Sequence, residues 1–198
     1  MRITAEEKAA TRSRILDVAR RLFAARGFDQ ATIRDIARDA DMAVGTLFNY
    51  FPSKEEVAVA LADFALGNAR QDFAKRRRAN ASLEEDLFLQ ISTQLRALKP
   101  LRKFIGPVVD SALSSPTRGR SREAKAQLWA DELDALAEIL HGHRIDADRW
   151  TMTVPIYWAL YVGVLSFWGR DKSPRQEDTL AMLDQATKMF VAWLETTD

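Results

Sequence analysis

The stretch Thr32–Phe51 reads TIRDIARDADMAVGTLFNYF and decides the fold. It opens with a capping box, in which Thr32 and Asp35 each satisfy a free N–H at the start of a helix. Asp41 begins a short turn, because aspartate tolerates the left-handed backbone region. A second short helix is expected over residues 44–50. Two short helices joined by a tight turn predict a helix-turn-helix.

The side chains of this stretch separate into an inward and an outward set. Apolar side chains at helical spacing are expected to pack between the two helices, and these are Ile36, Ala37, Ala40, Leu47, Phe48 and Phe51. Small or polar side chains are expected to face outward from the second helix, and these are Val44, Thr46 and Asn49. Gly45 lets the backbone approach a partner closely, because it has no side chain. The second helix is therefore a candidate for insertion into the major groove of DNA.

Longer helices are expected on both sides of this stretch. The first runs from about Thr4 to Arg26 and opens with a capping box of Thr4 and Glu7. Gly27 suits a left-handed helix end that lets Phe28 fold back on Phe23. Pro52 ends the second short helix.

A long helix is then expected over residues 53–78. Further helices are predicted near residues 82–98, 101–115 (short or kinked), 121–141, 147–169 and 174–195. Capping boxes open three of the helices after residue 52, at Ser53/Glu56, Ser82/Glu85 and Ser173/Gln176. We expect an all-α fold of about nine helices, with a helix-turn-helix domain over residues 1–52 and a larger bundle over residues 53–198.

Composition excludes several classes of function. The 198 residues contain no cysteine, which rules out disulfides, cysteine-ligated metals and thiol catalysis. The sequence has no glycine-rich phosphate loop and no serine elbow, and His141 and His143 are expected in a loop at a helix end rather than in a metal site. We therefore expect neither an enzyme nor a bound cofactor or metal. The N-terminus lacks an apolar signal-peptide core, which predicts a cytoplasmic protein.

Charge is distributed unevenly along a chain whose net charge is only +1. Residues 1–80 hold 15 basic and 11 acidic side chains, whereas residues 81–198 hold 14 and 17. The positive excess in the first part favours an anionic partner there. The basic run Lys75–Arg78 is expected to be a solvated helix end, where cations complement the helix dipole.

The blocks Phe28–Ala37 and Gly45–Glu56 resemble the N-terminal domain of the tetracycline-repressor (TetR) family, and the close resemblance covers about residues 11–61. Members of this family are homodimeric bacterial regulators of nine or ten helices. The resemblance implies a regulator, most often a repressor, that binds a pseudo-palindromic operator in double-stranded DNA and is released by a small apolar or aromatic effector.

The resemblance also implies roles for particular residues. It predicts contacts with bases or with the DNA backbone for Thr32, Arg34, Val44, Gly45, Thr46, Asn49, Tyr50 and Lys54. Three positions depart from the family pattern: the usual turn glycine is Asp41, the usual capping serine is Ala43, and the common tyrosine of the recognition helix is Phe48. These departures leave DNA binding intact but indicate an unusual affinity or operator.

Aromatic and apolar side chains of the second half predict a pocket and a dimer seam. The family pattern places an effector cavity near the aromatic residues, for which the candidates are Phe64, Phe104, Trp129, Trp158 and Tyr161. The helices near 147–169 and 174–195 have more apolar surface than one neighbour can cover, which indicates a second subunit. The candidate seam residues are Trp158, Leu165, Ala186, Met189, Phe190 and Trp193.

Two alternatives remain open from the sequence. Residues 150–169 carry no charge and are long enough to span a bilayer, so the chain could be a membrane-associated helical protein, although Pro155 and several polar residues make this a poor membrane helix. The chain could also be a DNA-binding regulator that is switched by a protein partner and has no small-molecule effector.

Overall fold

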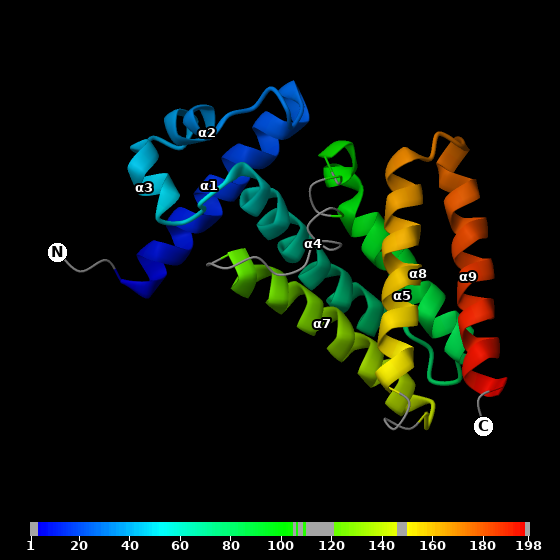
Figure 1. Cartoon of the computed structure of the whole chain (residues 1–198). Coiled ribbons are helices and arrows are strands. Elements are labelled where there is room, and N and C mark those ends of the chain that lie inside the picture. The colour runs from blue at the N-terminus through cyan, green and yellow to red at the C-terminus, as the bar shows by residue number, and fades with distance from the viewer. Residues whose placement is uncertain (1–3, 105, 107–108, 110–120, 146–149, 197–198) are drawn as a thin grey trace. The chain divides into compact units, whose positions relative to one another are not determined.

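The computed structural model describes residues 4–104, 106, 109, 121–145 and 150–196, and these residues contain helices and no strands (Figure 1). The chain divides into two compact units. The first unit comprises Met1–Phe64 and Pro100–Lys125, and the second comprises Ala65–Lys99 and Ala126–Asp198. The division of function at residue 52 stays a prediction.

Helix α1, Ala5–Arg26, begins at the predicted capping box. Glu7 N–H donates to Thr4 Oγ1 at 3.1 Å, and the Glu7 carboxylate accepts from Thr4 N–H at 2.8 Å. The helix ends at Gly27, whose φ of +82° and ψ of 159° form an extended conformation open mainly to glycine, not the predicted left-handed helical one. Phe28 nevertheless packs edge-on against Phe23, with ring centroids 5.1 Å apart, as predicted.

Helices α2, Ile33–Asp39, and α3, Val44–Phe48, confirm the predicted helix-turn-helix. Asp41 in the turn has a φ of +52°, the left-handed region expected of it. The shared core is formed by buried side chains, namely Ile36, Ala37, Ala40, Leu47 and Phe51.

The inward placement of Phe48 is wrong, because its side chain is 46% exposed. Successive residues of an α-helix point about 100° apart. Since Leu47 is fully buried, the next residue turns away from the core.

Helix α4, Lys54–Arg76, is long and belongs to both units. Helix α5, Leu83–Leu98, starts at a complete capping box of Ser82 and Glu85, whereas at Ser53 only the bond from Glu56 N–H to the serine hydroxyl forms. A 3₁₀ helix, η1, follows at Lys99–Phe104. Most of the short helix expected over 101–115 lies outside the described residues.

The second unit also contains α7, Ser121–Gly142, α8, Trp150–Arg170, and α9, Glu177–Thr196. Helices α5, α8 and α9 contact one another, and α8 lies beside α9 (Figure 1). Thr151–Arg170 is the one described segment that is long and apolar enough to cross a membrane. Its residues Tyr157, Tyr161 and Trp168 are buried, as in the core helix of a bundle.

Helix α9 begins three residues later than predicted. Pro174–Gln176 form a separate 3₁₀ turn, η3, and Ser173 makes no capping bond there. The cap is Asp171, whose carboxylate accepts hydrogen bonds from the N–H of Ser173 at 2.7 Å and from the N–H and hydroxyl of Thr179. These bonds, from Thr179 above all, hold the pKa of Asp171 well below its usual range.

Candidate nucleic-acid interface and ligand bundle

The outer surface of α3 carries the residues that the sequence assigns to DNA reading. Gly45, Thr46 and Asn49 are exposed, and Val44 and Tyr50 are half-buried. A Cβ atom built at Gly45 would meet no protein atom within 4 Å, so the fold itself does not require glycine there. The main chain of α3 is therefore open to a partner that approaches from outside.

Thr32 is held in place by a reciprocal cap at the start of α2. Its hydroxyl donates to Asp35 Oδ2 at 2.7 Å and accepts from Asp35 N–H at 3.1 Å. The hydrogen bonds from Thr32, assisted by the nearby Arg38 guanidinium 3.0 Å away, lower the pKa of Asp35. Arg34, two residues along, is exposed. The DNA contacts assigned to Thr32 and Arg34 stay predictions.

Lys54 has a structural role that the sequence does not reveal. Its ammonium lies over the Phe28 ring, 4.3 Å from the centroid, and donates to the Phe28 carbonyl at 2.7 Å. It therefore ties the start of α4 to the segment between α1 and α2. A phosphate contact through another of its N–H groups stays a prediction. The guanidinium of Arg12 lies over the ring of Phe51, 5.2 Å from its centroid.

The expected effector residues do not form one group, since only three of the five lie together. Trp129 of α7 stacks on Trp158 of α8 with centroids 3.6 Å apart, and Tyr161 lies 5.7 Å from Trp158. Phe64 is 67% exposed, because it is on the outer side of α4. Phe104 packs inside the first unit against Phe23, at 5.1 Å, and against Phe28.

Beside these aromatic rings lies a buried carboxylate that sequence reasoning missed. Glu132 of α7 accepts hydrogen bonds from Gln94 Nε2 of α5 at 2.5 Å and from the Tyr157 hydroxyl of α8 at 2.7 Å. Burial raises the pKa of Glu132 to about 7, although the two hydrogen bonds and the Arg70 guanidinium oppose this shift. The sequence contains no signal for this site, since Glu132 is one of many carboxylates on predicted amphipathic helices.

His143 also makes a contact that its assignment to a loop did not predict. Asp86 of α5 is buried, and its Oδ2 is 2.8 Å from His143 Nε2 and 2.7 Å from Arg77 Nη2. The three side chains join the ends of α4 and α7 to the start of α5. Among the described residues, no group of three or more His, Cys, Asp or Glu side chains is arranged to hold a metal.

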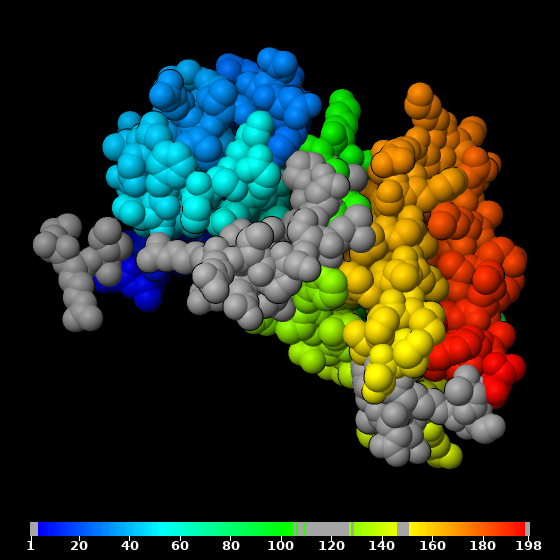
Figure 2. All heavy atoms as spheres, viewed as in Figure 1, coloured from blue at the N-terminus to red at the C-terminus, as the bar shows by residue number. Residues whose placement is uncertain are grey.

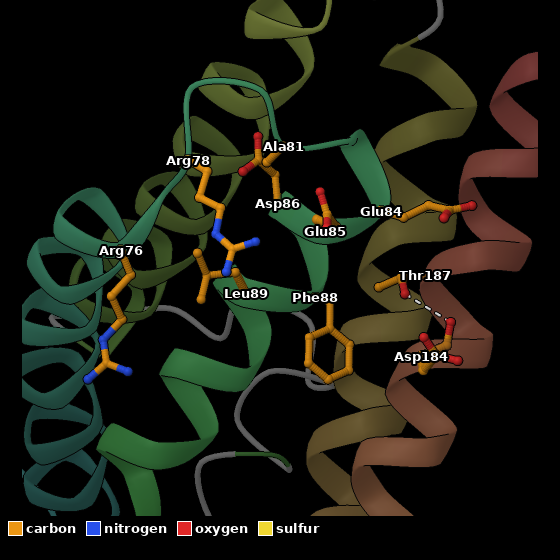
Figure 3. A pocket seen from close by; sticks show the side chains of 10 residues that line it. All are labelled: Arg76, Arg78, Ala81, Glu84, Glu85, Asp86, Phe88, Leu89, Asp184 and Thr187. Carbon is orange, nitrogen blue, oxygen red and sulfur yellow. Dashed lines mark hydrogen bonds between the residues drawn. The ribbon is translucent and has the colours of Figure 1, made fainter.

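A hollow of about 550 Å³ lies close to the start of α5. Figure 3 shows Arg76 and Arg78 on one side of it and Asp184 and Thr187 of α9 on the other. Phe88 and Leu89 supply apolar wall, and Glu84, Glu85 and Asp86 add negative charge. Basic Arg76 and Arg78 therefore face acids of their own chain, in agreement with a solvated helix end.

The predicted dimer seam needs a partial correction. Trp158, Leu165 and Phe190 are buried within the protomer. Trp158 stacks on Trp129 of α7, and the other two lie on α8 and α9, which contact each other and α5. Met189, in contrast, is 71% exposed, and Ala186 and Trp193 are half-buried. On α9, the side chain that is open to a partner is thus that of Met189, whereas its neighbour in sequence, Phe190, fills the core.

Comparison with known proteins agrees with this geometry. Residues 15–61 match the family model described as bacterial regulatory proteins, tetR family. An HTH-type transcriptional repressor of Mycobacterium tuberculosis is 39% identical over 160 residues, which cover 74% of this chain and 75% of that protein. The chain belongs to the tetR family.

Two further similarities support the tetR-family assignment. The HTH-type transcriptional repressor KstR2 of Rhodococcus jostii is 37% identical over 81 residues, and the match spans only 40% of its length. The structure of FadR from Thermus thermophilus, solved in complex with lauroyl-CoA, shares the fold with a TM-score of 0.71 and 23% identity over 91% of this chain and 93% of that one. The tetR-family relatives are transcriptional repressors, so the chain is a DNA-binding regulator and not an enzyme.

Proposed function

We propose that this tetR-family chain is a homodimeric repressor that binds a pseudo-palindromic operator and leaves it when a small effector binds. One observation carries the proposal: α3 exposes Gly45, Thr46 and Asn49 while Leu47, on its other side, is fully buried. A short helix on a rigid apolar frame, with small and polar groups outward, suits the base edges of a major groove.

A homodimer explains the apolar surface that α8 and α9 leave exposed. On α9 the stripe consists of Met182, Ala186, Met189 and Trp193, and on α8 it consists of Met152, Ile156, Leu160, Gly163 and Phe167. The surfaces of the two helices adjoin (Figure 2). A hollow of about 590 Å³, lined by Gly163, Phe167 and Met182 among others, lies where the two stripes meet.

Two such helices from each of two subunits would bury both stripes in a four-helix seam. The charged side of α9, with Asp184, Lys188 and Glu195, would remain in solvent. The same two-fold axis would present two copies of α3 to half-sites about 34–36 Å apart on DNA.

Release by an effector requires a link between the bundle and the recognition helix. Helix α4 provides that link, since one continuous helix begins shortly after α3 in the sequence of the first unit and continues into the second. The complex of the FadR relative with lauroyl-CoA supports a small-molecule site in a bundle of this fold. The effector acts as a switch only if it binds the released state more tightly than the operator-bound state.

A mobility-shift assay with the DNA upstream of the chain's own gene tests the regulator. We expect sequence-specific binding that weakens as salt rises. Asn49→Ala should change the sequence preference. Arg34→Ala should instead weaken binding to all sequences and reduce the slope of log affinity against log salt concentration by about 1. Absence of specific binding would overturn the proposal. Specific binding that no small molecule reverses would instead favour a regulator switched by a protein partner.

A further inference from the structure

The second unit contains a cluster of buried polar side chains contributed by three helices. It consists of Gln94 of α5, Glu132 of α7, and Tyr157 and Tyr161 of α8, and we call it the Glu132 cluster. All four side chains are at least 97% buried. Helix α5 is therefore joined to α7 and α8 through hydrogen bonds at the Glu132 carboxylate, not through apolar packing alone.

The cluster has hydrogen-bonding capacity that the described residues do not use. Gln94 Oε1 and the Tyr161 hydroxyl are buried and have no hydrogen-bond partner among those residues. Tyr161 lies next to Tyr157, which bonds the carboxylate, since the two rings stack with centroids 6.1 Å apart. Burial, together with the Glu132 charge, raises the pKa of Tyr161. Buried polar atoms without partners are uncommon in folded proteins. A bound group with N–H donors would satisfy both atoms.

When Glu132 is ionised, the charge at the cluster is negative and is not balanced by an ion pair. Arg70 is the nearest cation, but its guanidinium pairs with Asp131 at 2.8 Å. A hollow of about 470 Å³ among α4, α5 and α7 includes Arg70 and Asp131 in its lining, and both adjoin the cluster. Its other charged lining residues are Arg77, Asp134 and Glu138, so acids outnumber bases around it.

Residues that line the hollow precede members of the cluster on two helices. Gln90, whose Nε2 is also buried without a described partner, lines the hollow one helical turn before Gln94 on α5. Asp131 lines it immediately before Glu132 on α7. Trp158, whose ring stacks on that of Trp129, lies beside Tyr161. Aromatic faces next to a carboxylate favour a cation attached to an apolar body.

We propose that the bundle binds an organic cation, a primary or secondary amine on an aromatic or aliphatic body, whose ammonium donates to the Glu132 carboxylate, Gln94 Oε1 and the Tyr161 hydroxyl. This inference rests on the proposed function, because it assigns the organic cation the role of the effector that releases the operator. An ammonium has only donors to offer, which matches a cluster whose unused atoms can all accept. A carboxylate or an acyl-CoA would bring further negative charge and would be repelled.

The proposal implies a dependence of affinity on pH. The groups around Glu132 are Arg70 from α4, Gln94 from α5, Asp131 from α7, and Tyr157 and Tyr161 from α8. Glu132 changes charge near neutral pH, since burial raises its pKa to about 7. Cation binding requires the ionised carboxylate, so affinity should be highest above pH 7 and fall by about tenfold between pH 8 and pH 6.

The test is isothermal titration calorimetry of the full-length protein with matched probes. Tryptamine is compared with tryptophol and indole-3-acetate, phenethylamine with phenethyl alcohol and phenylacetate, and decylamine with decanoate and lauroyl-CoA. We expect at least one amine to bind tenfold or more tightly than its neutral and anionic counterparts at pH 8. Glu132→Gln should remove both that preference and the pH dependence.

Two further variants separate recognition from folding. Tyr161→Phe removes a hydroxyl that has no described partner, so it should weaken amine binding severalfold without lowering Tm. Glu195→Gln, at an exposed carboxylate of α9, should leave amine affinity unchanged. Binding of no amine, equal or tighter binding of an anionic probe, or a preference that survives Glu132→Gln would each overturn the inference.

The mobility-shift assay distinguishes this inference from the function on which it rests. Specific operator binding without amine binding overturns the ligand class and leaves the regulator intact. Amine binding that does not release the operator confirms the site but contradicts its role as the effector site.

Discussion

At the scale of single residues, replacing Gly45 should affect the stability of the fold and the affinity for DNA in opposite directions. No protein atom would meet a Cβ at this position, so Gly45→Ala should stabilise the chain by up to about 1 kcal/mol, because alanine loses less backbone entropy in a helix. The same methyl group would stand between α3 and DNA and weaken operator binding. Thermal unfolding and mobility shift measure the two effects.

Gly67→Ala in α4 is the matched control for Gly45→Ala. A Cβ at Gly67 also meets nothing within 4 Å, so stability should rise while operator binding stays unchanged. If Gly45→Ala binds the operator as tightly as the unaltered chain, close approach of the α3 backbone to DNA is contradicted.

Glu132 makes stability depend on pH in a direction unusual for a carboxylate. Its raised pKa means that the folded state binds more protons than the unfolded state between about pH 4.5 and 7. The free energy of unfolding should therefore fall by about 3 kcal/mol as pH rises through this window, and level off above it.

Glu132→Gln should remove this dependence and raise Tm at pH 8. The neutral amide can still accept from the Tyr157 hydroxyl and can donate to Gln94 Oε1. Thermal unfolding of the unaltered chain and of Glu132→Gln at pH 5 and pH 8 measures this pH dependence. Glu195→Gln, which changes an exposed carboxylate, is the control. If stability changed with pH in Glu132→Gln as it does in the unaltered chain, Glu132 would not be desolvated in the folded protein.

At the scale of elements, the start of α9 depends on Asp171 rather than on Ser173. Asp171→Ala removes the acceptor for three backbone and hydroxyl hydrogen bonds, so it should lower Tm more than Ser173→Ala, which removes the bond from Asp178 N–H and the interaction of the Ser173 hydroxyl with Asp171. Because the pKa of Asp171 is lowered, its contribution is present above pH 4 and is lost on acidification. Equal Tm losses for the two variants would contradict the assignment of the cap.

The helices that pattern alone predicted well are those with strong local signals. The capping boxes at Thr4, Thr32 and Ser82 all formed, and the turn at Asp41 has the expected left-handed backbone. Ser173 failed because a carboxylate two residues earlier competes for the same helix start. A local motif cannot reveal such competition.

The candidate sites were predictable to different degrees. The exposed set on α3 follows from helical spacing, except for Phe48, whose apolar character wrongly suggested burial. The inward position of Glu132 could not be predicted, because it depends on Gln94 and Tyr157, which are far from it in sequence. Burial of Phe190 rather than Met189 likewise depends on the angle at which α9 packs on α5 and α8.

At the scale of the whole molecule, the exposed stripe of α9 should determine the oligomeric state. Met189→Glu would place a charge in the proposed seam, where its desolvation is unfavourable. We expect sedimentation velocity to show dimers for the unaltered chain and monomers for this variant, with operator affinity reduced accordingly.

Lys188→Glu introduces the same side chain on the charged side of α9 and should leave the dimer intact, since breaking its exposed pair with Asp184 changes little. A dimer that persists in Met189→Glu would place the seam elsewhere.

The exposed ring of Phe48 has a consequence for the energetics of operator recognition. A benzyl group cannot pair with a phosphate, so it can add to affinity only by leaving water as the complex forms. That portion of the binding free energy should be insensitive to ionic strength and accompanied by a negative change in heat capacity. Phe48→Ala should therefore reduce the heat-capacity change measured by calorimetry while the slope of affinity against salt stays the same.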